Sequence, residues 1–272
     1  MRDLYLLKLG GSVITDLSKP NTVASGPVTI STLLEEAYEA YSSGGFDLII
    51  GHGSGSFGHV AAAQYKVSEG LAYPNSKLGA LITHMTAKQL NDIFIGEGIK
   101  LEMPLYPFSP ANFSFADNGE LRDGFCSHIE SAIEKGFIPV VYGDVVIDKS
   151  KGISVASTEK VLDFIANDIK PKKVLYGSDT DGVFTANPKE HPDARHIGVI
   201  DSSNIDQALE NTGVSNSRVD VTGGMKTKLA KLYETCKRTE AEGYIFNIKR
   251  PGMLKAMLLG IASPEFYTVV RA

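Results

Sequence analysis

The sequence alternates short apolar runs, rich in branched residues, with longer stretches whose apolar residues recur at helical spacing. Several of the short runs end in glycine, as strands of a parallel sheet commonly do. A helix after each strand supplies the crossover that parallel strands require. The pattern therefore predicts an α/β protein with a mainly parallel central sheet.

The same pattern gives approximate element bounds. Strands are expected at residues 4–9, 46–51, 137–142, 173–176 and 244–248. Helices are expected at about residues 27–43, 57–66, 76–96, 124–135, 156–167 and 224–240. Three prolines between residues 101 and 121 indicate edge strands or a hairpin turning at Asn118 and Gly119, and a second hairpin is expected over residues 145–154. No repeat or linker interrupts the chain, so residues 1–272 are expected to form a single domain whose halves share one sheet.

Composition excludes several classes of protein. The 27 Lys and Arg against 32 Asp and Glu give a net charge of −5, and the only short basic run is at residues 170–173, so no nucleic-acid partner is expected. No window approaches the ~18 apolar residues of a membrane span, so no membrane association is expected and a cytoplasmic location is predicted. Cys126 and Cys236 lack metal-ligand spacing and are expected to be reduced thiols.

Glycine is enriched, at 27 of 272 residues, and it gathers where strands end. Four glycine-bearing turns lie at residues 10–12, 53–58, 177–182 and 221–224. Glycine at the carboxyl end of a strand lets backbone N–H groups approach a phosphate, and a following helix adds its dipole. One such turn is equally well explained by tight chain reversal, but four favour an anionic ligand with several phosphates.

Common nucleotide motifs do not identify the ligand further. Gly53, Gly55 and Gly58 match the letters of the dinucleotide fingerprint, but no acid follows about 20 residues on. Val60 extends the match to the protein-kinase glycine loop, yet the other kinase motifs are missing, and no GxxxxGK[ST] sequence occurs. The signal for phosphate binding is therefore general.

Two lysines could stabilise a transferring phosphoryl group. Lys8 interrupts an apolar strand just before a glycine turn, and Lys228 lies near the start of a helix, where a cation is unfavourable unless an anion intervenes. Asp179 and Asp181 follow an apolar strand and could orient these lysines or hold Mg²⁺ through water. The alternatives are solvated lysines and a turn capped by aspartate.

One histidine follows the second glycine turn directly. His59 could donate to the phosphate of an acceptor, although a lone histidine is more often a capping or core residue. Only that structural interpretation is given to the other five histidines, which are His52, His84, His128, His191 and His196.

Together these motifs resemble the isopentenyl phosphate kinases of the amino acid kinase superfamily. The resemblance rests, in chain order, on residues 8–15, 51–59, 142–145, 178–183 and 220–228. The Ser-Phe-Gly-His sequence at residues 56–59 is its narrowest part and is shared mainly with fosfomycin-kinase relatives. The resemblance implies a three-layer αβα fold and ATP-dependent, Mg²⁺-assisted phosphorylation of isopentenyl phosphate to the diphosphate in an alternative mevalonate route. It also implies a homodimer, with acceptor binding by residues 1–170 and nucleotide binding by residues 171–272.

The resemblance also implies roles for individual residues. Lys8 and Lys228 would stabilise the transferring phosphoryl group, and Asp179 would hold them. Further ATP contacts would come from Gly10, Gly11, Ser12, Ser54 and Gly224. His59 would bind the acceptor phosphate together with Gly53, Gly58 and Gly143. The apolar tail would face Leu78, Leu81, Ile82 and Met85.

Two positions depart from the family pattern. The family's lysine after its first motif is replaced by Leu17, and Lys19 would take its place as a catalytic cation. Residues 156–159 read Ala-Ser-Thr-Glu where the family usually has Ser-Gly-Asp-Asp, so nucleotide contacts there are expected to differ. Two alternative functions stay open: a fosfomycin-type or carboxylate kinase, and a nucleotide-binding module without catalysis, which would tolerate loss of Lys8 and His59.

Overall fold

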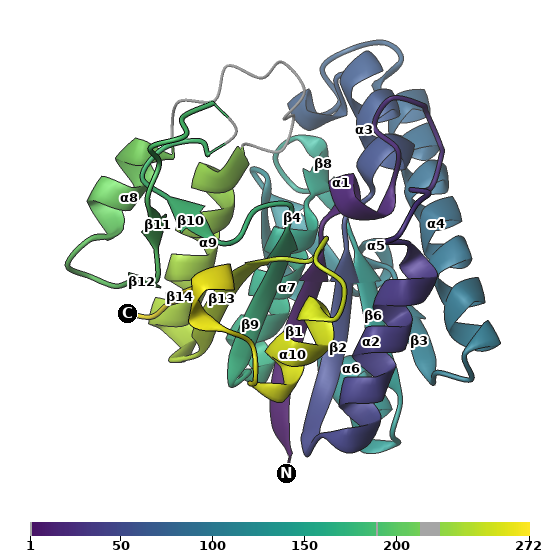
Figure 1. Ribbon diagram of the computed structural model, residues 1–272. Helices are drawn as coiled ribbons and strands as arrows, with labels where there is room; N and C mark the ends of the chain where they lie inside the picture. Colours follow the sequence, from purple (N-terminus) through teal and green to yellow (C-terminus); the bar gives the residue numbers. More distant parts are fainter. Residues whose placement is uncertain (1, 189, 213–223) are drawn as a thin grey trace.

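The computed structural model describes residues 2–188, 190–212 and 224–272. Its central sheet has eight strands in the order β12-β14-β13-β9-β1-β2-β6-β3 (Figure 1). The strands are β1 (Asp3–Leu9), β2 (Phe46–His52), β3 (Leu105–Phe108), β6 (Ile138–Tyr142), β9 (Lys173–Ser178), β12 (Val199–Ile200), β13 (Glu242–Asn247) and β14 (Tyr267–Val270). All neighbours pair in parallel except β13 and β14. The predicted α/β class with a mainly parallel sheet is confirmed.

Helices cover both faces of this sheet (Figure 1). One apolar core contains residues of α2 (Ile30–Ser43), α4 (Ser76–Lys100) and α10 (Met253–Leu259). The other contains residues of α6 (Ser127–Glu134), α7 (Thr158–Ile169), α8 (Ile205–Asn211) and α9 (Gly224–Thr239). Side chains alternate along β1, so Leu7 and Leu9 enter the first core and Leu6 the second. The three-layer αβα arrangement is therefore confirmed, and the alternation places Lys8 on the side of α7.

The two halves of the chain meet inside the sheet. β1, β2, β6 and β3 come from residues 1–170, and β9, β13, β14 and β12 come from residues 171–272. The chain leaves β1 toward β2 on one side, whereas β9 lies on its other side. Such a reversal opens a crevice at the carboxyl ends of the strands, which is where open α/β sheets bind ligands.

A smaller sheet, in the order β5-β4-β7-β8, is built from the two predicted hairpins. β4 (Ser114–Asp117) and β5 (Glu120–Gly124) turn at Asn118 and Gly119, both with positive φ, and β7 (Asp144–Asp148) and β8 (Gly152–Ala156) form the second hairpin. Asp148 joins the two turns. Its buried carboxylate accepts hydrogen bonds from the backbone N–H groups of Asn118, Gly119, Ser150 and Lys151 and from the Ser154 hydroxyl.

Several bounds differ from the prediction. α2 begins at Ile30 rather than Pro27, because Thr29 and Thr32 form a reciprocal capping box. α3 (Gly55–Gln64) starts inside the second glycine turn, and a short α1 (Gly11–Ile14) starts inside the first. The elements that were not predicted are mostly short: α5 (Pro110–Phe113), α8, α10, β10 (Val183–Phe184), β11 (His196–Ile197), β12, β14 and two 3₁₀ turns at Val67–Glu69 and Pro264–Phe266. Among the described helices, none combines the length and apolar character needed to cross a bilayer.

Candidate active site

The first two glycine turns pack directly against each other at the carboxyl ends of β1 and β2. A Cβ atom on Gly11 would lie 2.5 Å from the backbone nitrogen of Gly55, and one on Gly53 would lie 2.7 Å from the nitrogen of Gly11. Any larger residue at either position would force the two turns apart. The glycines predicted to contact ATP and those predicted to contact the acceptor thus form one continuous backbone surface. Ser12, beside this surface, is exposed to solvent.

Helix α3 begins on this surface and carries His59. Its first turn is fixed to the α1 segment because the N–H of Ser56 donates to Oγ1 of Thr15 over 3.0 Å. Gly58 is packed so closely that a Cβ atom there would lie 2.5 Å from Oγ of Ser54. His59 follows and is half-buried. The helix therefore directs the positive end of its dipole toward the carboxyl edge of the sheet, which favours an anion there.

Gly143 lies at the end of the neighbouring strand, β6. Its N–H donates to the carbonyl oxygen of His52 over 3.3 Å, and the Thr158 hydroxyl donates to the same oxygen over 2.8 Å. These bonds hold Gly143 beside the segment that leads into Gly53. Two glycines expected to contact the acceptor phosphate are thus adjacent, although they are 90 residues apart in the chain.

Lys8 forms a buried ion pair with Glu159, a residue that the sequence analysis did not assign to the site. The Nζ atom of Lys8 bonds Oε1 of Glu159, and the two side chains are only 6% and 11% exposed. Glu159 stands in the first turn of α7, on the side of the sheet toward which Lys8 points. The sequence signal that could have identified Glu159 was an acidic residue at the start of a helix that lies beside the strand ends.

Lys228 acts on the same carboxylate. Burial opposes ionisation of Glu159, but attraction by Lys8, hydrogen bonds from Lys8 and a backbone N–H, and the weaker attraction of Lys228 together hold the pKa of Glu159 below its ordinary value. Lys228 is half-buried in the first turns of α9, whereas Lys226 is exposed. One carboxylate therefore lies near two lysines from distant parts of the chain, and the lysines can present their charge to a phosphoryl group between β1 and α9.

The two aspartates after β9 have different surroundings. Asp181 accepts two hydrogen bonds of 2.6 Å from Arg250 and one of 3.0 Å from Asn247. Its carboxylate thus joins two segments of the chain, and its suggested role in orienting lysines or holding Mg²⁺ through water stays a prediction. Asp179 is half-buried at the end of β9, and its expected role in holding the lysines stays a prediction.

Two further residues that were predicted to belong to the site are Lys19 and Gly224. The Lys19 ammonium is 69% exposed and 3.9 Å from Oδ2 of Asp16, in the loop that returns to Ser56 through Asn21 and Thr22. Gly224 is the first residue of α9 with a described position, and it has a positive φ. The preceding part of the predicted turn, residues 221–223, lies outside the described residues.

Two of the histidines that were not assigned to the site, His52 and His84, have defined side-chain partners. His52 is fully buried, bonds Asn91 over 3.2 Å, and stacks against Phe94 and Tyr142. Burial lowers the pKa of His52 to about 4, so this histidine is a neutral core residue, as expected. His84 was expected to be a capping or core residue. It pairs with the buried carboxylate of Asp144, while its own side chain stays partly exposed.

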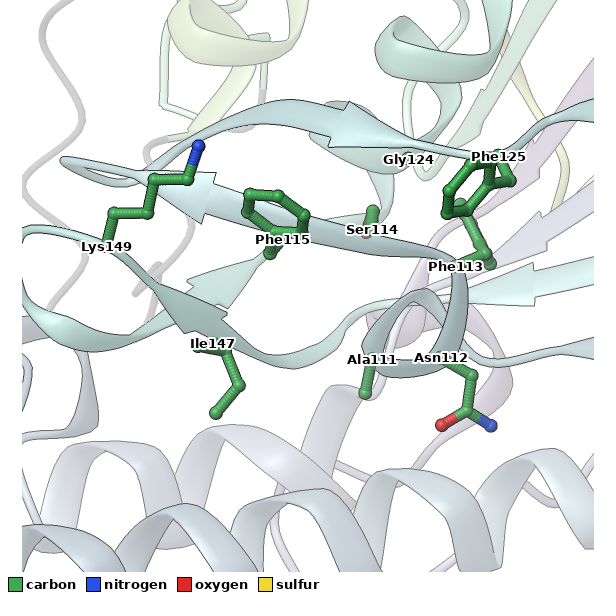
Figure 2. Close-up of a pocket in the computed structure, with 9 residues that line it drawn as sticks. All are labelled: Ala111, Asn112, Phe113, Ser114, Phe115, Gly124, Phe125, Ile147 and Lys149. Carbon is green, nitrogen blue, oxygen red and sulfur yellow. The ribbon is translucent and has the colours of Figure 1, made fainter.

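Two apolar hollows lie among the described residues, one on the smaller sheet and one between α3 and α4. A cleft of about 430 Å³ is formed on the smaller sheet by Phe113, Phe115, Phe125 and Ile147, with Lys149 at its edge (Figure 2). A hollow of about 190 Å³ between α3 and α4 is lined by Ile82 together with Phe57 and Val60. Leu78, Leu81 and Met85, which were expected to face an apolar tail, are more than half exposed on α4.

Within the described residues, no three side chains of His, Cys, Asp or Glu are grouped as a metal site would require. Cys126 and Cys236 are free, and burial raises the pKa of each thiol to about 12. Both thiols are therefore protonated at neutral pH.

Comparison with known proteins shows the family of the chain. The family model described as the amino acid kinase family matches residues 3–247. An isopentenyl phosphate kinase of Methanothermobacter thermautotrophicus is 35% identical over 269 residues, which cover 94% of this chain and 96% of that protein. One isopentenyl phosphate kinase crystal structure superposes with a TM-score of 0.80 at 28% identity, covering 98% of this chain and 99% of its own. A second, described as a substrate complex, has a TM-score of 0.73 at 26% identity, with coverages of 98% and 100%. The chain belongs to the amino acid kinase family.

Proposed function

We propose that this protein transfers the γ-phosphoryl group of ATP to isopentenyl phosphate, forming isopentenyl diphosphate. The observation that carries the proposal is the pairing of two elements: a buried lysine–carboxylate pair at the end of β1, and a glycine surface leading into His59 on α3. Most of the chain is also similar to kinases named for this acceptor.

The acceptor would bind to the N-terminal half of the chain. Its phosphate would contact Gly53, Gly58 and Gly143, with His59 donating to an oxygen. Its apolar tail would lie against α4 and the smaller sheet, where apolar side chains remain accessible. ATP would approach from the C-terminal half, over Gly10, Gly11 and Ser12, with Ser54, Gly224 and Asp179 as further contacts.

Catalysis follows from charge and alignment. As the γ-phosphoryl group passes between two phosphates, Lys8 and Lys228 would counter its charge while Glu159 keeps Lys8 in place. Lys19 would add a further cation from the rim. Mg²⁺ would enter with the nucleotide, since this ion is usually held largely by substrate phosphates and water, and would offset phosphate charge. The protein would act in the cytoplasm as a homodimer.

One acceptor screen tests the proposal. Purified protein is incubated with Mg-ATP and each of several acceptors: isopentenyl phosphate, fosfomycin, glutamate and N-acetylglutamate. ADP release and the phosphorylated product are both measured. Efficient turnover of isopentenyl phosphate alone is expected. Preference for fosfomycin or a carboxylate would reassign the acceptor, and ATP binding without any transfer would favour the non-catalytic alternative.

A further inference from the structure

His84 on α4 and Asp144 at the start of β7 form a pair that the roles proposed above do not use. Nδ1 of His84 lies 2.9 Å from both carboxylate oxygens of Asp144. The Ser109 hydroxyl donates to Oδ2 over 3.0 Å, and the N–H of Val145 donates to Oδ1 over 2.7 Å. The carboxylate is therefore fully satisfied and fully buried, whereas the His84 side chain stays 33% exposed.

The imidazole of His84 is engaged on one side only. Its Nδ1 faces Asp144, which keeps a proton on that nitrogen. Its Nε2 has no hydrogen-bond partner within the described part of the chain. A histidine that is fixed at one nitrogen and accessible at the other is suited to contact a ligand, because its orientation is already set before binding.

The position of His84 along α4 places it on the ligand side of the sheet. Asn91 of the same helix bonds His52 at the carboxyl end of β2, so Asn91 marks the level of the sheet edge. His84 precedes Asn91 by seven residues, which is about two turns and about 10 Å along the same helix face. This half of α4 lies beside α3, at the end of the sheet where α1 and α3 begin (Figure 1).

The negative charge of Asp144 explains why a histidine is useful at this position. Asp144 directly follows Gly143, a proposed contact of the acceptor phosphate. Burial raises the pKa of Asp144, but the charge of His84 and its hydrogen bond oppose this rise. An uncompensated carboxylate at this point would repel an anionic acceptor, whereas a protonated His84 cancels its charge.

On the basis of the proposed function, we propose that His84 is a second histidine contact for the acceptor phosphate. Asp144 holds Nδ1–H, and Nε2–H of the protonated ring donates to a phosphate oxygen of isopentenyl phosphate. His59 approaches the same group from α3. The acceptor would thus be recognised by two histidines on two helices, with the glycine surface beneath it.

Substitution of His84 by glutamine distinguishes a contact with the ligand from a purely structural bond to Asp144. His84→Gln keeps an N–H donor for Asp144 but removes the cationic ring and its Nε2–H, and His84→Ala removes both interactions. We expect His84→Gln to raise the KM for isopentenyl phosphate about ten-fold while the KM for ATP and the melting temperature stay near wild type. His128→Gln, on the exposed face of α6, is the matched control and should change neither constant. An unchanged acceptor KM in His84→Gln, or equal changes in both KM values, would overturn the proposal.

A binding measurement keeps this test independent of turnover. In protein labelled with ¹⁵N-histidine, the His84 ring resonances, assigned by their loss in His84→Gln, are followed during titration with inorganic phosphate and then with isopentenyl phosphate. A saturable shift at Nε2 with either anion is expected. Absence of a shift with both anions contradicts the contact. If the wild-type enzyme shifts with phosphate but does not phosphorylate isopentenyl phosphate, the acceptor assignment fails and the histidine contact stands.

Discussion

The ammonium of Lys8 and the carboxylate of Glu159 form a buried ion pair across 151 positions of sequence, between the end of β1 and the first turn of α7. Neither charge could remain alone in this environment, because an unpaired buried ion is strongly destabilising. The pair therefore couples the fold to the chemistry: the charge that would stabilise the transferring phosphoryl group is kept in place by the helix that covers the sheet.

Removing the carboxylate should affect both stability and turnover. Glu159→Gln is expected to lower the free energy of unfolding by about 3 kcal/mol, because the Lys8 charge loses its partner. It should also lower kcat, because Lys8 loses the partner that keeps its charge in place. Urea unfolding and steady-state kinetics check this, with Asp92→Asn as the control: its partner Lys88 is exposed, so less than about 1 kcal/mol should be lost. Equal destabilisation in the two variants would argue against the pair.

The proposed phosphoryl contact of Lys228 predicts a loss of turnover. Lys228→Ala should reduce kcat by about 10²-fold, the usual scale for one preorganised charge or donor at a transition state. The exposed Lys226 is its control, and Lys226→Ala should stay within a few-fold of wild type. Single-turnover kinetics with saturating ATP measure the effect. If both alanine variants behave alike, Lys228 does not serve the transfer.

His59 should act mainly on the acceptor. His59→Ala is expected to raise the KM for isopentenyl phosphate about ten-fold, since a charge-assisted hydrogen bond is lost, and to change the KM for ATP little. Initial rates over a matrix of both substrate concentrations separate the two constants. A larger effect on ATP would move His59 to the nucleotide side.

His52 gives the stability of the protein a specific dependence on pH. Burial lowers its pKa from 6.5 to about 4, so the unfolded chain binds more protons between these values and stability falls as pH decreases through this window. From pH 7 to pH 5 this one group should remove about 2 kcal/mol of unfolding free energy. His52→Gln keeps a polar group near Asn91 without titrating there. The difference between wild-type and variant unfolding curves at the two pH values isolates the contribution, and parallel losses in both would contradict it.

Asp148 should stabilise the smaller sheet. Asp148→Asn replaces one acceptor oxygen with an N–H₂ group that faces backbone donors, so a loss of at least about 2 kcal/mol is expected. Despite its burial, hydrogen bonds hold the pKa of Asp148 well below its usual range, so its contribution is present above about pH 4 and is lost as pH falls further. Asp117→Asn on the same hairpin, which loses one acceptor for the Ser150 hydroxyl, should cost less. Chemical denaturation at pH 7 and pH 3.5 tests both statements.

Much of the fold was readable from the chain because local patterns carried it. Short apolar runs and the glycines that end them predicted all the strands nearest the centre of the sheet, and Asn118 with Gly119 predicted a hairpin turn through their tolerance of positive φ. The short outer strands β12 and β14 were missed because so few residues carry no clear period, and their pairing depends on neighbours far away in sequence.

The sequence by itself determined which residue types stand at the strand ends: the glycines that can approach phosphate, Lys8 within an apolar strand, and His59 after the second turn. Only the tertiary structure decided which charges meet. Glu159 pairs with Lys8, Asp181 is held by Arg250, and His84 is joined to Asp144. Spacing along a chain fixes the face on which a side chain lies, but partners more than a few turns apart are set by how helices and sheet pack, since packing alone determines which buried charges can compensate each other.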